Sequence, residues 1–209
     1  MNKPVIIIGA GGHAKVLADC LRLQVVSVLG ALDKSVSTGS KTADLPILGN
    51  DSAIGAYPCD SVELVNGLGS AGDTSLRKKI FDRFNQQGYT FRTVIHPSAI
   101  IARDCVLGEG VQVMAGAVIN TGTRIAADSI INTGAIIDHE CDIGQHVHVA
   151  PGVTLSGGVH VADGVHIGTG ATVIQGINID AGALVGAGAV VIRDVEKGAK
   201  VAGVPAKNM

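Results

Sequence analysis

Five histidines lie close together in the C-terminal half of the chain, and one of them has a carboxylate beside it. They fall within 28 residues and are His139, His146, His148, His160 and His166. Glu140 directly follows the first of them. An exposed imidazole can take a proton from an amine or a hydroxyl near neutral pH, and an adjacent carboxylate can orient the ring and stabilise the imidazolium. We therefore identify His139 as a candidate general base and Glu140 as its partner.

The direction of these side chains depends on the repeat that contains them. Seventeen consecutive units of six residues run from Ile95 to Glu196 without an insertion. The first position is always Ile, Leu or Val, and the fifth is always Ala, Cys, Ser, Thr, Val or Ile. Because six is a multiple of the two-residue strand period, each unit can be a short strand and a turn, with the first and fifth positions pointing inward. Three units per coil, about 18 residues, would form a triangular prism of stacked parallel strands.

The repeat assigns His139 and the cysteines to opposite environments. His139 is at a third position, which points outward, whereas Cys105 and Cys141 are at fifth positions in the core. A covalent intermediate on Cys141 is therefore disfavoured. With Cys20 and Cys59 the chain has four cysteines, without a CxxC motif or short spacing. Buried free thiols are expected, rather than a disulfide framework or a zinc site.

The first ninety residues predict a different architecture, a strand followed by a glycine-rich turn and a helix. An apolar run over 4–8 leads into Gly9-Ala10-Gly11-Gly12-His13-Ala14, and 15–23 is amphipathic. This G-x-G-x-x-A arrangement lets a phosphate approach backbone N–H groups at a helix N-terminus. Asp33 ends a second predicted strand over 25–32, where an acid can bind ribose hydroxyls or a base N–H. Only one mononucleotide half is present, so a nucleotide-linked substrate held by its diphosphate is favoured over NAD.

These patterns divide the chain into two predicted domains. Residues 1–94 form a small Rossmann-like α/β domain with a parallel sheet, and 95–209 form the parallel β-helix with a C-terminal tail. The net charge of −2 and the lack of a basic stripe argue against a nucleic-acid partner. The apolar runs are too short to span a bilayer, and no signal peptide is evident, so we expect a cytoplasmic protein with no membrane partner.

The repeat closely resembles the [LIV]-[GAED]-x-x-[STAV]-x pattern of the left-handed parallel β-helix acyltransferases, and the handedness is implied by that resemblance. The ending Gly203-Val204-Pro205-Ala206-Lys207 is also similar to that family. Across the whole chain, the order of the motifs resembles the sialic-acid O-acetyltransferase and bacillosamine-pathway N-acetyltransferase type. The motifs are Gly11-Gly12-His13, Asp33-Lys34, Ile95-His96-Pro97-Ser98-Ala99, Asn132-Thr133 and His139-Glu140.

The resemblance implies a role for each matching residue. His139 is the general base, assisted by Glu140, and Asn132 lies nearby. His148 and the backbone N–H of Gly157 face the acetyl group of acetyl-CoA. The nucleotide sugar is held by Gly11, Gly12, His13, Asp33 and Lys34, whereas Gly170 and Lys207 are candidates for contacts with CoA. The resemblance also implies a homotrimer with active sites between subunits, and no metal is expected.

The resulting hypothesis is an acetyl-CoA-dependent N-acetyltransferase. Its substrate would be the 4-amino group of a nucleotide-linked, preferably UDP-linked, 4-amino-4,6-dideoxy sugar, used for bacterial surface glycans or glycoproteins. O-acetylation of sialic acid stays open as the alternative. A zinc carbonic anhydrase-like prism would need an H-x-x-x-x-H pair, which the sequence lacks. A purely structural solenoid of the ice-binding kind would need a flat threonine face, which is also missing.

Overall fold

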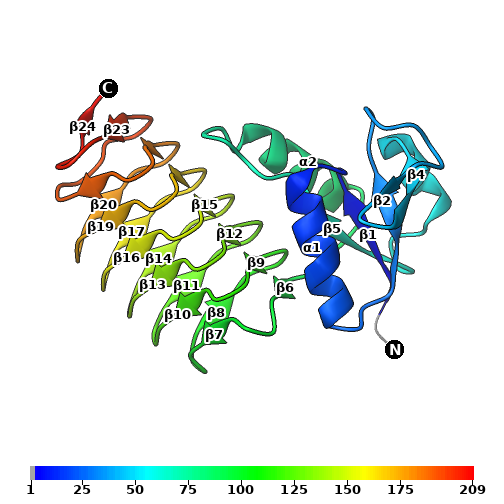
Figure 1. Ribbon diagram of the computed structural model, residues 1–209, viewed down its shortest axis with the longest axis horizontal. Helices are drawn as coiled ribbons and strands as arrows, with labels where there is room; N and C mark the ends of the chain where they lie inside the picture. The colour runs from blue at the N-terminus through cyan, green and yellow to red at the C-terminus, as the bar shows by residue number, and fades with distance from the viewer. Residues whose placement is uncertain (1–2) are drawn as a thin grey trace.

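The computed structural model describes residues 3–209 and has two parts, the first packed against one side of the second (Figure 1). The first is a small α/β part, and the second is a long stack of two-residue strands. The chain passes from one to the other at β6 (Val94–Ile95).

The α/β part is built on a five-stranded sheet in the order β3-β4-β2-β1-β5. All neighbours in this sheet are parallel except β3 and β4, which are antiparallel. Its elements, in chain order, are β1 (Val5–Ile8), α1 (Gly12–Leu23), β2 (Val28–Leu32), β3 (Lys41–Thr42), β4 (Leu45–Gly49), the 3-10 helix η1 (Asp51–Ala56), β5 (Glu63–Asn66) and α2 (Ser75–Gln86).

The alternation of side chains along β1 explains why helices pack on both faces of this sheet. Val5 and Ile7 belong to the cluster that includes α1, whereas Ile6 and Ile8 pack in the cluster that includes α2. Successive residues of a strand point to opposite faces, and a sheet covered on both sides has continuously apolar strands. The α1 cluster also takes in Met114 of the β-helix, so the two parts share a core.

Two element boundaries differ from the sequence-based expectation. The second strand begins at Val28 rather than at Val25, because Val25 has a φ of 56°, which an extended strand does not accommodate. Helix α1 begins at Gly12, three residues earlier than expected. Its first turn therefore lies inside the glycine-rich segment.

The strands of the β-helix form three flat faces, each a parallel sheet. The domain-covered face consists of β6, β9 (Gln112–Val113), β12 (Ile130–Ile131), β15 (His148–Val149), β18 (His166–Ile167), β21 (Leu184–Val185) and β23 (Lys200–Ala202), to which β24 (Lys207–Asn208) adds antiparallel. The apolar face consists of β7 (Ile100–Ile101), β10 (Val118–Ile119), β13 (Ile136–Ile137), β16 (Thr154–Leu155), β19 (Thr172–Val173) and β22 (Val190–Val191). The polar face consists of β8 (Val106–Leu107), β11 (Arg124–Ile125), β14 (Asp142–Ile143), β17 (His160–Val161) and β20 (Asn178–Ile179).

The register of these faces confirms the six-residue repeat. Ile136 pairs with Val118 below it and with Thr154 above it, each 18 residues away. The first positions of the units fill a continuous aliphatic core, and Cys141 lies within this core with 1% of its surface exposed. Cys105 is half-buried against the same core.

The fourth position of each unit turns the chain at a corner of the prism and favours glycine. Eleven glycines at this position have φ between 66° and 71°, the left-handed region that costs other residues about 1–2 kcal/mol. Three residues with side chains adopt the same conformation, Asp128 (57°), Glu140 (58°) and His146 (56°). Because this conformation is costly, it points to a specific role for each of these three side chains.

A buried ion pair joins the α/β part to the β-helix. Arg77 of α2 is 1% exposed and Asp128 is fully buried, with Arg77 Nη2 2.8 Å from Asp128 Oδ1. Arg77 Nε donates to the Asp128 carbonyl oxygen (3.0 Å), and Nη1 donates to the carbonyl oxygens of Asn66 (3.0 Å) and Leu68 (2.7 Å). The guanidinium thus contacts both parts of the molecule.

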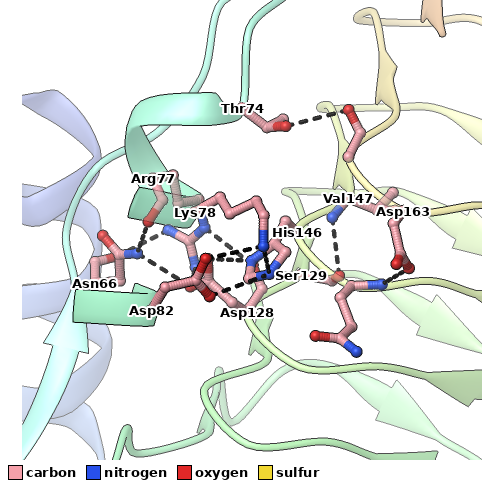
Figure 2. A network of polar contacts seen from close by, with 12 residues as sticks. Asn66, Thr74, Arg77, Lys78, Asp82, Asp128, Ser129, His146, Val147 and Asp163 are labelled. Carbon is pink, nitrogen blue, oxygen red and sulfur yellow. Dashed lines mark hydrogen bonds and ion pairs between the residues drawn. The ribbon is translucent and has the colours of Figure 1, made fainter. Parts of the chain in front are cut away.

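His146 and Asn66 also contact the buried carboxylate of Asp128 through polar atoms (Figure 2). His146 Nδ1 lies 3.0 Å from Asp128 Oδ2, and Asn66 Nδ2 donates to Asp128 Oδ1 at 3.1 Å. His146 stands 18 residues after Asp128, one coil higher at the same corner. Two of the three left-handed side chains therefore belong to this junction.

None of the helices within residues 3–209 combines the length and the apolar composition that crossing a bilayer requires.

Replacing Arg77 by Met should lower the free energy of unfolding by about 3–5 kcal/mol, because the Asp128 carboxylate would stay buried without its cation. Arg83→Met on the same helix is the matched control, since Arg83 pairs with Asp51 (2.5 Å) where both side chains are partly exposed. Such a pair contributes about 1 kcal/mol or less. Urea unfolding followed by circular dichroism measures both, and equal losses would contradict a special role for the junction pair.

Candidate functional site

His139 and Glu140 lie at the corner between β13 and β14, which we call the His139 corner. His139 Nδ1 is 3.2 Å from Glu140 Oε2, and the two side chains are 53% and 76% exposed. The left-handed backbone of Glu140 (φ 58°) occurs at the position where the other corners mostly have glycine. The pair thus has the contact that a base and its orienting carboxylate require, on an accessible surface.

Asp138 fixes the backbone at this corner from the other side. Its Oδ1 accepts the His139 N–H at 2.8 Å and Asn120 Nδ2 at 2.9 Å. The hydrogen bond from Asn120, and then the one from His139, lower the pKa of the Asp138 carboxyl. Asp138 therefore stays an acceptor and holds the His139 backbone in place.

Gly157 stands one coil above His139, and the imidazole lies against it. A Cβ added to Gly157 would be 2.5 Å from both Cε1 and Nε2 of His139, a distance at which the ring must move. Within residues 3–209 the Gly157 N–H has no hydrogen-bond acceptor. This donor beside the Nε2 edge of the ring is suited to a developing oxyanion.

The same corner continues up the prism towards the C-terminus. His139, Gly157, Gln175 and Arg193 occupy third positions of successive coils, which are stacked at about 4.8 Å. Arg193 and Lys207 line a common cavity of about 260 Å³ at the last coil. Lys207 is thus located beside Arg193, the last residue of the column that contains His139.

The glycine-rich segment of the α/β part leaves an open helix start. Gly11 precedes α1 without a side-chain cap, and a Cβ added to Gly11 or to Gly12 would meet no atom of residues 3–209 within 4 Å apart from its chain neighbours and the backbone of the helix itself. The first N–H groups of a helix have no partner within it, and they attract anions. The start of α1 thus has the backbone N–H groups that the sequence predicts as a phosphate-binding feature.

Asp33 follows β2 and lies beside the glycine-rich segment. Both of its carboxylate oxygens accept hydrogen bonds. Oδ2 accepts the Ala10 N–H (2.8 Å), and Oδ1 accepts the N–H (2.8 Å) and the hydroxyl (2.6 Å) of Ser35. Burial would raise the pKa of Asp33, but these hydrogen bonds outweigh it and lower the pKa. Asp33 therefore shapes the loop, besides lining a cavity of about 160 Å³ together with Lys34, Leu68, Leu76 and Ile80.

His13 is held by the β-helix in one tautomer. Its Nε2 lies 2.7 Å from Gln112 Oε1, while Gln112 Nε2 donates to the Asn66 carbonyl oxygen at 2.8 Å. Gln112 Oε1 must therefore accept, so the proton of the neutral ring is on Nε2 and Nδ1 is left as an acceptor. Burial, and then the charge of Arg77, lower the pKa of His13 to about 4.

His148 is buried on the domain-covered face, in contact with Asn132. His148 is 6% exposed, and its Nε2 lies 3.0 Å from Asn132 Nδ2. Burial, followed by the charges of His166, His13 and Arg77, lowers the pKa of His148 to about 3. His148 is thus a neutral ring that positions an amide and is a weak base.

The structure does not bring all the sequence-predicted residues together within one chain. Asn132 lies at the corner between β12 and β13, which we call the Asn132 corner, whereas His139 lies at the next corner along the coil. The apolar face separates the two corners. Gly170 shares the Asn132 corner two coils higher, with open space around it and a φ of 68°.

Sequence reasoning missed two contributors to these contacts, Ser70 and Gln112. Ser70 Oγ lies 2.7 Å from His148 Nδ1 and 3.0 Å from His166 Nδ1. The partners are 78 and 96 residues apart in the chain, and no local pattern indicates such contacts. The pairing of β15 with β18 places His148 beside His166, as the 18-residue period predicts for two residues one coil apart.

Within residues 3–209, no three side chains of His, Cys, Asp or Glu gather as metal ligands would.

Comparison with known proteins identifies relatives for the whole chain. Residues 4–84 match the family model of the PglD N-terminal domain. UDP-N-acetylbacillosamine N-acetyltransferase of Bacillus subtilis is 39% identical over 117 residues, which is 54% of this chain and 52% of that protein. The match thus spans about half the length of that curated relative.

Two solved structures resemble the chain over its full length. PerB from Caulobacter crescentus, in complex with CoA and GDP-perosamine, is 39% identical with a TM-score of 0.92, covering 99% of this chain and 97% of that one. The acetyltransferase domain of PglB from Neisseria gonorrhoeae, in complex with acetyl coenzyme A, is 31% identical with a TM-score of 0.93 and full coverage of both chains. These likenesses confirm the family that the motifs predicted and the left-handed form of the β-helix. The chain is an acyltransferase and belongs to the hexapeptide-repeat sugar acetyltransferase family of the sialic-acid O-acetyltransferase and bacillosamine-pathway N-acetyltransferase type.

Proposed function

We propose that the protein transfers the acetyl group of acetyl-CoA to the 4-amino group of a nucleotide-linked 4-amino-4,6-dideoxy sugar. The observation that carries this proposal is the His139–Glu140 contact with the Gly157 N–H beside it, which has no acceptor among residues 3–209. The α/β part, residues 1–94, would hold the nucleotide sugar, and 95–209 would bind acetyl-CoA. The relatives use two nucleotides, UDP in the Bacillus name and GDP in the Caulobacter complex. UDP is our preferred nucleotide and GDP its direct competitor.

His139 would act as the base in a direct attack. The sugar amine attacks the thioester carbonyl carbon while His139 Nε2 takes the proton from the amine. Glu140 faces Nδ1 and stabilises the imidazolium, and the Gly157 N–H donates to the oxyanion. The C–S bond then breaks, CoA leaves as the thiolate, and the proton on His139 neutralises it. Cys141 takes no part, because its side chain is in the core.

The environments of the other histidines favour this assignment. Burial lowers the pKa of His13 to about 4 and that of His148 to about 3, whereas an effective general base has a pKa near the working pH. These two rings are neutral at pH 7 and suit hydrogen bonding to substrates. His139, in contrast, is exposed and has a carboxylate next to it.

A homotrimer would unite the two separated corners. The outward residues of the apolar face include Ile100 (66% exposed) and Ile136 (42% exposed), whereas the polar face presents Arg124, Asp142 and His160 outward. Packing three apolar faces around an axis would bury these aliphatic side chains. It would also bring the His139 corner of one protomer beside the Asn132 corner of the next. We therefore propose active sites between subunits.

The substrate class is tested by measuring thiol release from acetyl-CoA with a panel of acceptors. We expect turnover with UDP- or GDP-linked 4-amino sugars and none with free sialic acids, because the open start of α1 is suited to a diphosphate. Turnover confined to sialic acid would replace the proposal by O-acetylation. No release with any amino sugar would contradict it.

Replacing His139 by Ala should lower kcat by roughly 10²–10⁴, the usual contribution of a general base, with little change in affinity for acetyl-CoA. His160→Ala is the matched control. His160 is also an exposed histidine beside a carboxylate, with Nδ1 3.5 Å from Asp142 Oδ2, but it lies on the polar face. Steady-state kinetics and calorimetry with CoA measure both. Wild-type turnover in the His139 variant would exclude this residue as the base.

The inter-subunit site is tested by mixing two inactive variants. His139→Ala and Asn132→Ala protein, unfolded together and refolded at equal ratio, should regain about a quarter of wild-type activity, because one in four interfaces combines the intact residues of both. Each variant refolded alone is the control. If both residues act within one protomer, the mixture stays as inactive as its components.

A further inference from the structure

Ser70 lies where the α/β part contacts the histidines of the β-helix. It belongs to the loop 67–72 that follows β5, and its hydroxyl lies between two rings, 2.7 Å from His148 Nδ1 and 3.0 Å from His166 Nδ1. The rings are perpendicular, with centroids 5.0 Å apart. A single hydroxyl thus bridges adjacent coils.

The direction of the hydrogen bonds follows from Asn132. Its Oδ1 accepts the Thr133 N–H at 2.8 Å, and a backbone N–H can only donate. The amide nitrogen of Asn132 is therefore the atom that faces His148 Nε2, at 3.0 Å. Since Nδ2 donates, His148 Nε2 must accept, and the proton of the neutral ring is on Nδ1.

The same reasoning extends through Ser70. The Nδ1–H of His148 donates to Ser70 Oγ, which leaves the only hydroxyl hydrogen of Ser70 for His166 Nδ1. His166 accepts there and carries its own proton on Nε2. Burial lowers the pKa of His166 as well as that of His148, which keeps both rings neutral and the direction of the chain of hydrogen bonds unchanged.

We propose that Ser70 is a positioning residue for acetyl transfer, which accepts from His148 Nδ1, so that this ring is held with its Nε2 against the Asn132 amide, and which fixes the tautomer of His166. This role rests on the proposed function, because Asn132 is the residue expected near the reacting groups. Ser70 lies in the part that would hold the nucleotide sugar, whereas Asn132 and His148 belong to the β-helix. The chain from Ser70 through His148 to Asn132 links the two.

The tautomers are measured directly by ¹⁵N NMR of histidine-labelled full-length protein, with signals assigned through His148→Gln and His166→Gln. The wild type should show His148 protonated on Nδ1 and His166 on Nε2. Ser70→Ala should give mixed tautomers at His166, because this ring loses the hydroxyl that donates to its Nδ1, whereas Ser70→Thr should restore the wild-type pattern and Ser61→Ala should leave it unchanged. Ser61 is exposed, and its hydroxyl donates to the Pro58 carbonyl oxygen at 2.7 Å.

Kinetic measurements decide whether this direction of the hydrogen bonds matters for acetyl transfer. Ser70→Ala should lower kcat roughly tenfold, the effect of about one hydrogen bond, at an unchanged KM for the nucleotide sugar, and Ser70→Thr should recover it. Wild-type tautomers in Ser70→Ala, or wild-type kcat with altered tautomers, would overturn the role of Ser70. Wild-type protein with the expected tautomers but no transfer to any amino sugar would instead reject the function and leave the hydrogen-bond order established.

Discussion

The contact between Arg77 and Asp128 is the interaction on which the geometry of the site depends. Among residues 3–209 it is the one place where a fully buried charge of the β-helix is neutralised by a side chain of the α/β part. A buried ion pair is a weak source of stability compared with apolar packing, but it tolerates few alternative arrangements. Since Asn66 and Gln112 extend the same network to His13, the pair sets where the glycine-rich segment stands relative to the β-helix.

The network also explains why the histidines of this chain have different environments. His13 and His148 are enclosed at the junction, and their environment keeps them neutral. His139 lies on the far side of the coil, beyond the reach of that enclosure, with Glu140 as its neighbour. The same division of labour between buried and exposed ionisable groups occurs widely in active sites. In this chain it follows from which face of the prism the α/β part covers.

Much of the β-helix could be predicted from sequence, because its contacts repeat at a fixed interval. The rule that third positions point outward and fifth positions point inward correctly placed His139 at the surface and Cys141 in the core. The junction could not be predicted in this way. Ser70 and His148 are 78 residues apart, and no periodicity relates a loop of the α/β part to a coil. Asp33 was located by its motif, but its engagement with Ala10 and Ser35 depends on loop geometry that the motif does not specify.

The left-handed conformation of Glu140 has a consequence for how this protein can change over time. Glycine would relieve the backbone at position 140 and suit the coil better, as it does at eleven other corners. Such a substitution would remove the carboxylate that faces His139. Under the proposed mechanism, selection for a more stable fold and selection for turnover therefore act in opposite directions at this residue, and a glycine there would mark a descendant that had kept the scaffold and given up the proposed reaction.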